Sequence, residues 1–326
     1  MSHVELWWDG GAALAESPLW CAEQACFYWV DISGQRIWRH DGSARPAQNW
    51  QLDQAVGCIA LRAGGGLVAA LQDGVYALEL GAAARPQMTL LAAALHGKGL
   101  RFNDGRCDRQ GRFWVGSMHE DPEAIERLPL GRLARLAAPS QERDGPPRPF
   151  LTPSGGGRRR SSAWGPSEST GCWAPALREA MLVPNGLAFS PSGDKLYFSD
   201  SAPTVAKVWV CDYDPASGQA ADPRVFIDRL ITGRPDGAAV DVEGCYWICA
   251  NDGAAVLRYT PTGQLDRRIE LPVAKPTMCA FGGADMATLL ITSMRPAGAG
   301  VQATLAGALF ALRPGVTGLP ETPYAD

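Results

Sequence analysis

The chain has 326 residues, of which 46% are hydrophobic, so it carries enough apolar material for a core. Its formal net charge of −4 gives no electrostatic reason to expect nucleic acid or an anionic membrane as a partner. The N-terminal sequence MSHVELWWDGG lacks a basic region followed by an apolar run, and no stretch of about 18 apolar residues occurs in the chain. We therefore expect neither a secretory signal nor a transmembrane helix, and we expect a cytoplasmic protein.

The nine cysteines are scattered and form no CxxC pair, and the four histidines stand at no HxH or HExxH spacing. In a reducing cytoplasm such cysteines are expected to be small buried hydrophobic residues. Any metal must therefore be held mainly by oxygen ligands, or by residues that lie far apart in the sequence.

Six segments of the chain share one pattern: a turn, a short apolar run, a second turn and a β-rich run. They begin at residues 16, 56, 104, 185, 236 and 277, and four of the five intervals measure 40 to 51 residues. This spacing is typical of a four-stranded propeller blade, which takes about 40–50 residues. The aromatic and β-branched runs predict strands, and no long segment shows helical periodicity. The sequence therefore predicts one all-β domain over residues 1–326, a six-bladed β-propeller.

The interval between the third and fourth repeats is 81 residues long. Its excess falls within about residues 127–181, a stretch that is rich in Pro, Gly, Ser and Arg and poor in β-branched residues. This composition predicts a long disordered insertion. A second hypothesis is a reading-frame slip in the gene, which would impair folding of this blade.

Oxygen-bearing side chains stand at the beginnings of several repeats. Equivalent positions of successive blades lie around one ring, so we expect Glu16, Asn185, Asp236 and the Asn103–Asp104 pair to converge near the central channel. Carboxylate and amide oxygens suit a hard cation such as Ca²⁺, Mg²⁺ or Mn²⁺. Asn-Gly and Asp-Gly are also common turn dipeptides, but Glu16 is not a turn residue and shares their phase.

Motifs at these positions resemble a known family. They are Glu16-Ser-Pro-Leu-Trp20, Arg101-Phe-Asn-Asp-Gly105, Gly111-Arg-Phe-Trp-Val-Gly-Ser-Met118, Pro184-Asn-Gly-Leu-Ala-Phe-Ser-Pro191, Leu196-Tyr-Phe-Ser-Asp-Ser201, Pro235-Asp-Gly237, Asp241-Val-Glu-Gly244 and Phe281-Gly-Gly283. In their order and spacing the chain resembles the SMP-30/gluconolactonase family, also called regucalcin-like proteins. The resemblance runs from the first blade to the last, apart from the excess within 127–181.

The resemblance implies a propeller with one divalent metal ion (Ca, Zn, Mn or Mg) that hydrolyses a sugar lactone to an aldonic acid. The implied metal ligands are Glu16, Asn185 and Asp236, and the implied substrate-binding residues are Arg101 and Asn103. Glu120, in the motif Ser117-Met-His-Glu120, is also expected on the substrate side.

A metal ion at this place would polarise the lactone carbonyl and lower the pKa of bound water, and Asp236 would accept a proton from that water. The sequence has no GxSxG nucleophile elbow, which disfavours a serine-hydrolase route. Two alternatives stay open: a metal-dependent esterase or phosphotriesterase, and a non-catalytic calcium-binding propeller.

Overall fold

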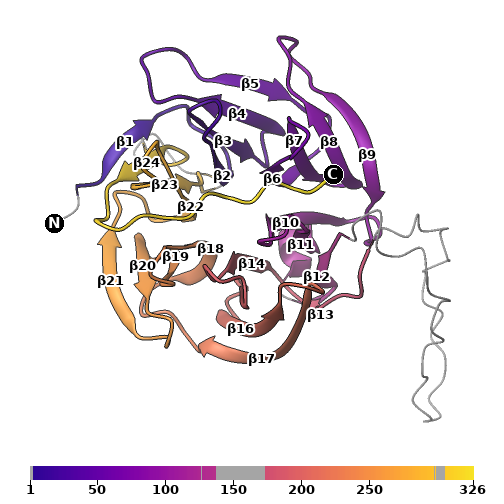
Figure 1. Cartoon of the computed structure of the whole chain (residues 1–326), viewed down its shortest axis with the longest axis vertical. Helices are drawn as coiled ribbons and strands as arrows, with labels where there is room; N and C mark the ends of the chain where they lie inside the picture. The colour runs from indigo at the N-terminus through magenta and orange to yellow at the C-terminus, as the bar shows by residue number, and fades with distance from the viewer. Residues whose placement is uncertain (1–2, 126, 137–172, 297, 299–304) are drawn as a thin grey trace.

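A computed structural model describes residues 3–125, 127–136, 173–296, 298 and 305–326. It confirms the predicted six-bladed β-propeller: six four-stranded antiparallel sheets stand around a common axis (Figure 1). No helix in the described part of the chain has the length and apolar character needed to cross a membrane.

Five blades are formed by consecutive strands, with the first strand innermost and the fourth outermost. Blade 1 contains β2 (Ala15–Cys21), β3 (Cys26–Asp31), β4 (Arg36–His40) and β5 (Gln48–Gln51). Blade 2 contains β6 (Val56–Leu61), β7 (Leu67–Leu71), β8 (Gly74–Glu79) and β9 (Gln87–Ala93). Blade 3 contains β10 (Leu100–Cys107), β11 (Phe113–His119), the short helix α1 (Pro122–Ile125), β12 (Gly131–Arg135) and β13 (Arg178–Met181).

Blade 4 contains β14 (Pro184–Phe189), β15 (Lys195–Asp200), β16 (Lys207–Asp214) and β17 (Gln219–Ile227). Blade 5 contains β18 (Arg234–Val240), β19 (Tyr246–Asn251), β20 (Ala255–Tyr259) and β21 (Leu265–Glu270). Blade 6 joins both ends of the chain, because β1 (Glu5–Trp8) pairs as the outer strand with β24 (Leu309–Leu312), beside β23 (Thr288–Ser293) and β22 (Pro276–Gly282).

The apolar core is divided into six layers, one between each pair of neighbouring blades. The inner strands are buried on both faces, whereas most residues of the outer strands β9 and β17 are exposed. The eight cysteines of the described residues carry free thiols, and all of them are buried, as expected for small hydrophobic side chains. Because the blades pack against each other around the ring, the axis is left free for polar side chains.

Each innermost strand carries a bulge near its beginning, where its pairing with the second strand of the blade shifts register. The bulge begins after Glu16 in β2, after Asn185 in β14 and after Pro235 in β18. Glu16 and Asn185 therefore occupy equivalent positions, as the repeat predicted, while Asp236 lies one residue later, inside its bulge. A bulge re-aims side chains locally, which is common next to functional sites.

The Asn-Gly dipeptide of blade 4 belongs to a bulge and not to a turn. Gly186 has φ +64°, and a Cβ atom on it would lie 2.5 Å from the hydroxyl oxygen of Tyr246. The equivalent residue in blade 1, Ser17, adopts the same left-handed conformation with φ 51° despite its side chain. Its hydroxyl accepts a hydrogen bond from the Ile59 amide of the next blade at 3.0 Å, which helps to hold this backbone.

The predicted insertion within 127–181 is bounded on both sides by strands of the third blade. Residues 131–135 form β12 and residues 178–181 form β13, and the two strands pair with each other. Residues 137–172 lie outside the described residues. The insertion and the frame-slip hypothesis therefore stay predictions.

The C-terminal segment crosses one end of the ring (Figure 1). Gly318 bridges to Asp241 after β18, and Tyr324 bridges to Arg62 after β6. Tyr324 is buried in the layer between blades 2 and 3. The segment thus contacts the end of the ring where the inner strands finish. Glu16 and Asn185 lie at the opposite end, where the inner strands begin.

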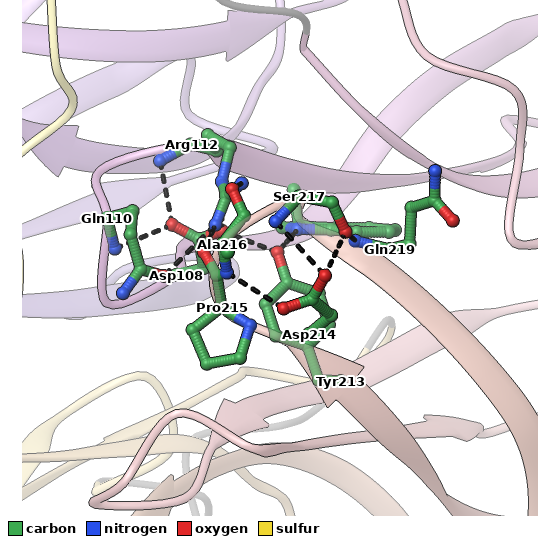
Figure 2. Close-up of polar contacts among 10 residues, drawn as sticks. Asp108, Gln110, Arg112, Tyr213, Asp214, Pro215, Ala216, Ser217 and Gln219 are labelled. Atoms are coloured by element: carbon green, nitrogen blue, oxygen red, sulfur yellow. Dashed lines mark hydrogen bonds and ion pairs between the residues drawn. The ribbon is translucent and has the colours of Figure 1, made fainter.

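A buried ion pair joins blade 3 to blade 4 (Figure 2). The Asp108 carboxylate accepts a hydrogen bond from Nε of Arg112 at 2.6 Å and from the Tyr213 hydroxyl at 2.5 Å. The Arg112 guanidinium also donates to the carbonyl oxygens of Pro215 and Ala216, in the turn between β16 and β17. The Asp108 and Arg112 side chains are 0% and 6% exposed, so removal of either partner would leave a buried charge uncompensated.

We expect Asp108→Ala to lower the free energy of unfolding by about 3 kcal/mol, because Arg112 would stay buried without its carboxylate. Urea unfolding followed by tryptophan fluorescence measures this loss. The matched control is Asp53→Ala, which removes an ion pair with Arg85 whose two side chains are both largely exposed. Such a pair contributes little, so equal losses for the two variants would contradict the role given to Asp108.

Candidate active site

A cavity of about 430 Å³ opens at the beginnings of the inner strands. Five of the six residues predicted from the sequence line it: Glu16, Arg101, Asn103, Asn185 and Asp236. They come from β2, β10, β14 and β18, four different blades. The ring therefore brings together residues that lie up to 220 positions apart in the sequence.

Glu16 is buried at the beginning of β2, with 9% of its surface exposed. Its Oε2 atom accepts a hydrogen bond from the backbone amide of Ser17 at 3.1 Å. Its Oε1 atom has no hydrogen-bond partner among the described residues. One carboxylate oxygen of Glu16 is thus available to a ligand in the cavity.

Asn185 is held in one amide orientation by its neighbour Ser201. The Ser201 hydroxyl donates its proton to the carbonyl oxygen of Pro235, so its oxygen must accept from Nδ2 of Asn185, at 2.8 Å. The Oδ1 atom of Asn185 is consequently turned away from Ser201, and it has no partner in the described part of the chain. It is a second free oxygen at the cavity.

Asp236 is also buried, and one of its oxygens is already engaged. Its Oδ2 atom accepts a hydrogen bond from Nδ2 of Asn251 at 2.7 Å. Its Oδ1 atom lacks a partner within the described ranges. Glu16, Asn185 and Asp236 therefore each keep one oxygen free, and each uses its other polar atom to fix the side chain.

Arg101 and Asn103 hold each other on the wall of the cavity. One terminal nitrogen of Arg101 donates to Oδ1 of Asn103 at 2.8 Å and to the Phe102 carbonyl at 2.9 Å. The Asn103 amide nitrogen donates to the carbonyl of Pro184 in the next blade at 3.0 Å. The other nitrogens of Arg101 have no partner among the described residues, so they can donate hydrogen bonds to a ligand.

Two predicted positions differ from this arrangement. Glu120 is exposed, receives a hydrogen bond from the Gln72 side chain and does not line the cavity. Burial lowers the pKa of Arg101, and the charges of Glu16 and then Glu120 partly oppose this lowering. The role of Glu120 in substrate binding stays a prediction. Asp104, expected to converge with Asn103, instead accepts a hydrogen bond from the Leu187 amide at 2.8 Å and does not line the cavity.

The charged forms of the two carboxylates in the site, Glu16 and Asp236, are disfavoured by their surroundings. Burial, followed by the charges of Asp236 and Asp104, raises the pKa of Glu16 well above its usual range. Burial also raises the pKa of Asp236 to about 7, although the positive charge of Arg234 lowers it. Two buried carboxylates that repel each other favour either a bound proton or a bound cation.

The free atoms at this place fit a divalent metal ion. Two carboxylate oxygens and one amide oxygen form a hard-donor set, and a cation would relieve the repulsion between the two charges. A second acidic group in the described residues, Asp241 with Glu243, fits a metal less well. Arg258 already forms ion pairs with both carboxylates, at 2.7 and 2.5 Å, so its positive charge already compensates theirs.

Four further polar residues line the cavity without having been assigned a site role from the sequence. They are Ser201, Arg234, Asn251 and Asp252. Ser201 is the last residue of the motif Leu196-Tyr-Phe-Ser-Asp-Ser201. Asn251 is the last residue of the second strand of blade 5, and the equivalent residues of blades 1 and 4 are Asp31 and Asp200. That difference at equivalent positions was the one sequence signal that could have identified Asn251.

A sequence model of the SMP-30/Gluconolactonase/LRE-like region matches residues 14–147 and 164–295 of this chain. The 6-deoxy-6-sulfogluconolactonase of Pseudomonas putida is 34% identical over 319 residues, which cover 96% of both chains. The L-arabinolactonase of Azospirillum brasilense is 32% identical over 290 residues, covering 88% of this chain and 83% of the relative. These relatives are named as lactone hydrolases, the enzyme class expected from the sequence.

Among solved structures, a regucalcin of Agrobacterium tumefaciens, described as a calcium-binding protein, superposes with a TM-score of 0.81. The two chains are 24% identical, and the match covers 99% of this chain and 97% of the other. This likeness shows the fold.

The buried carboxylates predict how stability depends on pH. A carboxyl whose pKa rises on folding stabilises the native state below its unfolded pKa, near 4, and this contribution is lost as the pH rises toward 7. In the presence of a chelator, the melting temperature should therefore fall between pH 4 and pH 7, and Asp236→Asn should reduce this fall. Equal pH dependence of the two proteins in differential scanning fluorimetry would contradict the assignment.

Proposed function

We propose that this chain, which belongs to the SMP-30/Gluconolactonase/LRE-like family, hydrolyses a sugar lactone to an aldonic acid with the help of one divalent metal ion. The observation that carries the proposal is the cavity itself, which is lined by Glu16, Asn185 and Asp236 from three blades, each with one free oxygen, and by Arg101 with its free donors. The names of the relatives support the lactone as the substrate.

Glu16, Asn185 and Asp236 would hold the metal ion through their free oxygens. When bound, it supplies Lewis acidity toward the lactone carbonyl and lowers the pKa of water. In the reaction the water oxygen bonds to the carbonyl carbon, the ring C–O bond breaks, and the ring oxygen leaves with a proton as a hydroxyl group.

Asp236 is the proposed proton acceptor for the attacking water. A general base works best when its pKa lies near the operating pH, and burial brings the pKa of Asp236 into that range before a metal is bound. Asn251 keeps Oδ2 of this carboxylate engaged, so Oδ1 would contact the ion through one lone pair and accept the proton through the other.

Arg101 is the proposed substrate anchor. Its guanidinium group is held by hydrogen bonds to Oδ1 of Asn103 and to the Phe102 carbonyl. Its remaining N–H groups can donate to the ring oxygen or hydroxyl oxygens of the lactone. Asn103, through its bond to Pro184, ties this anchor to blade 4. The eight described free thiols suit a reducing compartment, so we place the activity in the cytoplasm.

One observation favours the esterase alternative as a second candidate. Part of the cavity is lined by apolar side chains: Leu14, Ile32, Met118, Ile125 and Met294. Such a wall would suit the aromatic or alkyl part of a simple ester better than a sugar hydroxyl.

A substrate panel separates the proposed function from its alternatives. We expect acid release from glucono-, xylono-, galactono-, arabino- or 6-sulfogluconolactone, loss of this activity with a chelator, and recovery on addition of Mn²⁺, Zn²⁺, Mg²⁺ or Ca²⁺. Asp236→Asn should lower kcat by roughly 10³-fold, because the proton acceptor is lost. Glu243→Gln, in the second acidic group, is the control and should keep both activity and metal dependence. Preference for aryl esters, or full activity of metal-free protein, would contradict the proposal.

Glu16 provides a separate test of the metal site. Glu16→Gln keeps the side-chain volume but removes one of the two negative charges. Loss of a residue that only supports a ligand usually weakens metal binding by at least about tenfold. Because Glu16 is a proposed ligand itself, we expect its loss to lower the affinity for Mn²⁺ by more than that. Isothermal titration calorimetry without substrate measures this affinity. If Glu243→Gln weakens Mn²⁺ binding and Glu16→Gln does not, the metal belongs at the other acidic group.

A further inference from the structure

Asn251 is a buried side chain, 2% exposed, at the end of β19. Its Nδ2 atom donates to Oδ2 of Asp236 at 2.7 Å and approaches the Pro276 carbonyl of blade 6 at 3.3 Å. Asn251 thus connects the candidate proton acceptor with the backbone of the neighbouring blade.

The orientation of the Asn251 amide follows from its other partner, Arg234. A terminal nitrogen of Arg234 donates to Oδ1 of Asn251 at 3.2 Å, and a guanidinium has donors only. The oxygen of the Asn251 amide must therefore face Arg234, so its NH₂ group faces Asp236. Arg234 is itself fixed by Asp252, which accepts from its Nε at 2.8 Å.

The equivalent positions in two other blades show what this position does elsewhere. Asp31 in blade 1 accepts hydrogen bonds from the backbone amides of Ala13 and Leu14, and Asp200 in blade 4 accepts from those of Leu182 and Val183. Both are anchors for the loop that precedes the inner strand. In blade 5 the residue is an amide of the same shape, and its donor is directed at Asp236 instead of at a loop.

We propose that Asn251, oriented by Arg234, is a positioning residue that holds Oδ2 of Asp236 and thereby presents Oδ1 to the cavity. This role rests on the proposed function, in which Oδ1 of Asp236 binds the metal ion and accepts the proton. An aspartate at position 251 would restore the residue type of blades 1 and 4, but it would replace the donor by an acceptor beside the Asp236 carboxylate.

Two variants that keep the branched, four-atom skeleton of the Asn251 side chain separate positioning from packing. Asn251→Asp is isosteric, so a residue that only fills space would tolerate it, whereas a positioning residue would not. Asn251→Leu removes the hydrogen bonds to Asp236 and Pro276 and the one from Arg234, and fills the space with apolar atoms. The matched control is Asp31→Asn, the equivalent position of blade 1, which should lower the melting temperature and leave kcat unchanged.

We expect both Asn251 variants to lower kcat by about 10–100-fold, the usual effect of losing a residue that supports a ligand. KM should change by less than about threefold, because the substrate anchor Arg101 is untouched. Without substrate, Asn251→Leu should weaken Mn²⁺ binding in calorimetry by about tenfold. Circular dichroism verifies that the variants fold.

The inference is overturned if Asn251→Asp keeps kcat within about twofold of the wild type, or if Asn251→Leu binds Mn²⁺ as tightly as the wild type does. Failure of the proposed function gives a different result, since wild-type protein would then hydrolyse no lactone. In that case the Mn²⁺ affinity of Asn251→Leu would still decide whether Asn251 positions Asp236.

Discussion

The pairing of β1 with β24 is the constraint on which the rest of the molecule depends. It joins the two ends of the chain in one sheet, in the register Glu5 with Ala311 and Leu6 with Phe310. This pairing closes the ring, so every blade is packed on both sides and only short sheet edges remain. Once the ring is closed, the beginnings of the inner strands have to meet at the axis, and side chains from four blades line one cavity there.

The closed ring also explains why acidic groups can be buried at its centre. The apolar layers lie between blades, so the axis carries no hydrophobic core of its own. Bulges at the beginnings of β2, β10, β14 and β18 lie beside the polar side chains that line this space. Each of the three candidate ligands uses one polar atom in a hydrogen bond with a neighbour and keeps one oxygen free. The neighbours are Ser17 for Glu16, Ser201 for Asn185 and Asn251 for Asp236.

Much of this arrangement could be predicted from the sequence. The repeat gave the number of blades, and its phase brought Glu16, Asn185 and Asp236 together with Asn103, because equivalent positions of a closed ring must lie near each other. What the phase could not supply was the direction of individual side chains. Relative to the bulge, Asp236 lies one residue later than Glu16 and Asn185, since the bulge of β18 begins after Pro235 and not after Asp236.

Other details depend on neighbours that are remote in the sequence. Asp104 turns to the Leu187 amide of the next blade, and Glu120 stands outside the cavity beside Gln72. Asn251 was missed because its meaning comes from two partners, Arg234 and Asp236, that become adjacent only in the folded blade. The closing strand β1 likewise carries too short a pattern, Glu5–Trp8, to reveal its partner at the other end of the chain.

We propose that one metal ion binds between the free oxygens of Glu16, Asn185 and Asp236. The most direct measurement is a crystal structure of protein grown with Mn²⁺, with data collected near the manganese absorption edge. If the ion binds there, one strong anomalous peak will lie within coordination distance of these three oxygens. A peak at Asp241 and Glu243 instead, or no peak in the cavity, would contradict the proposal.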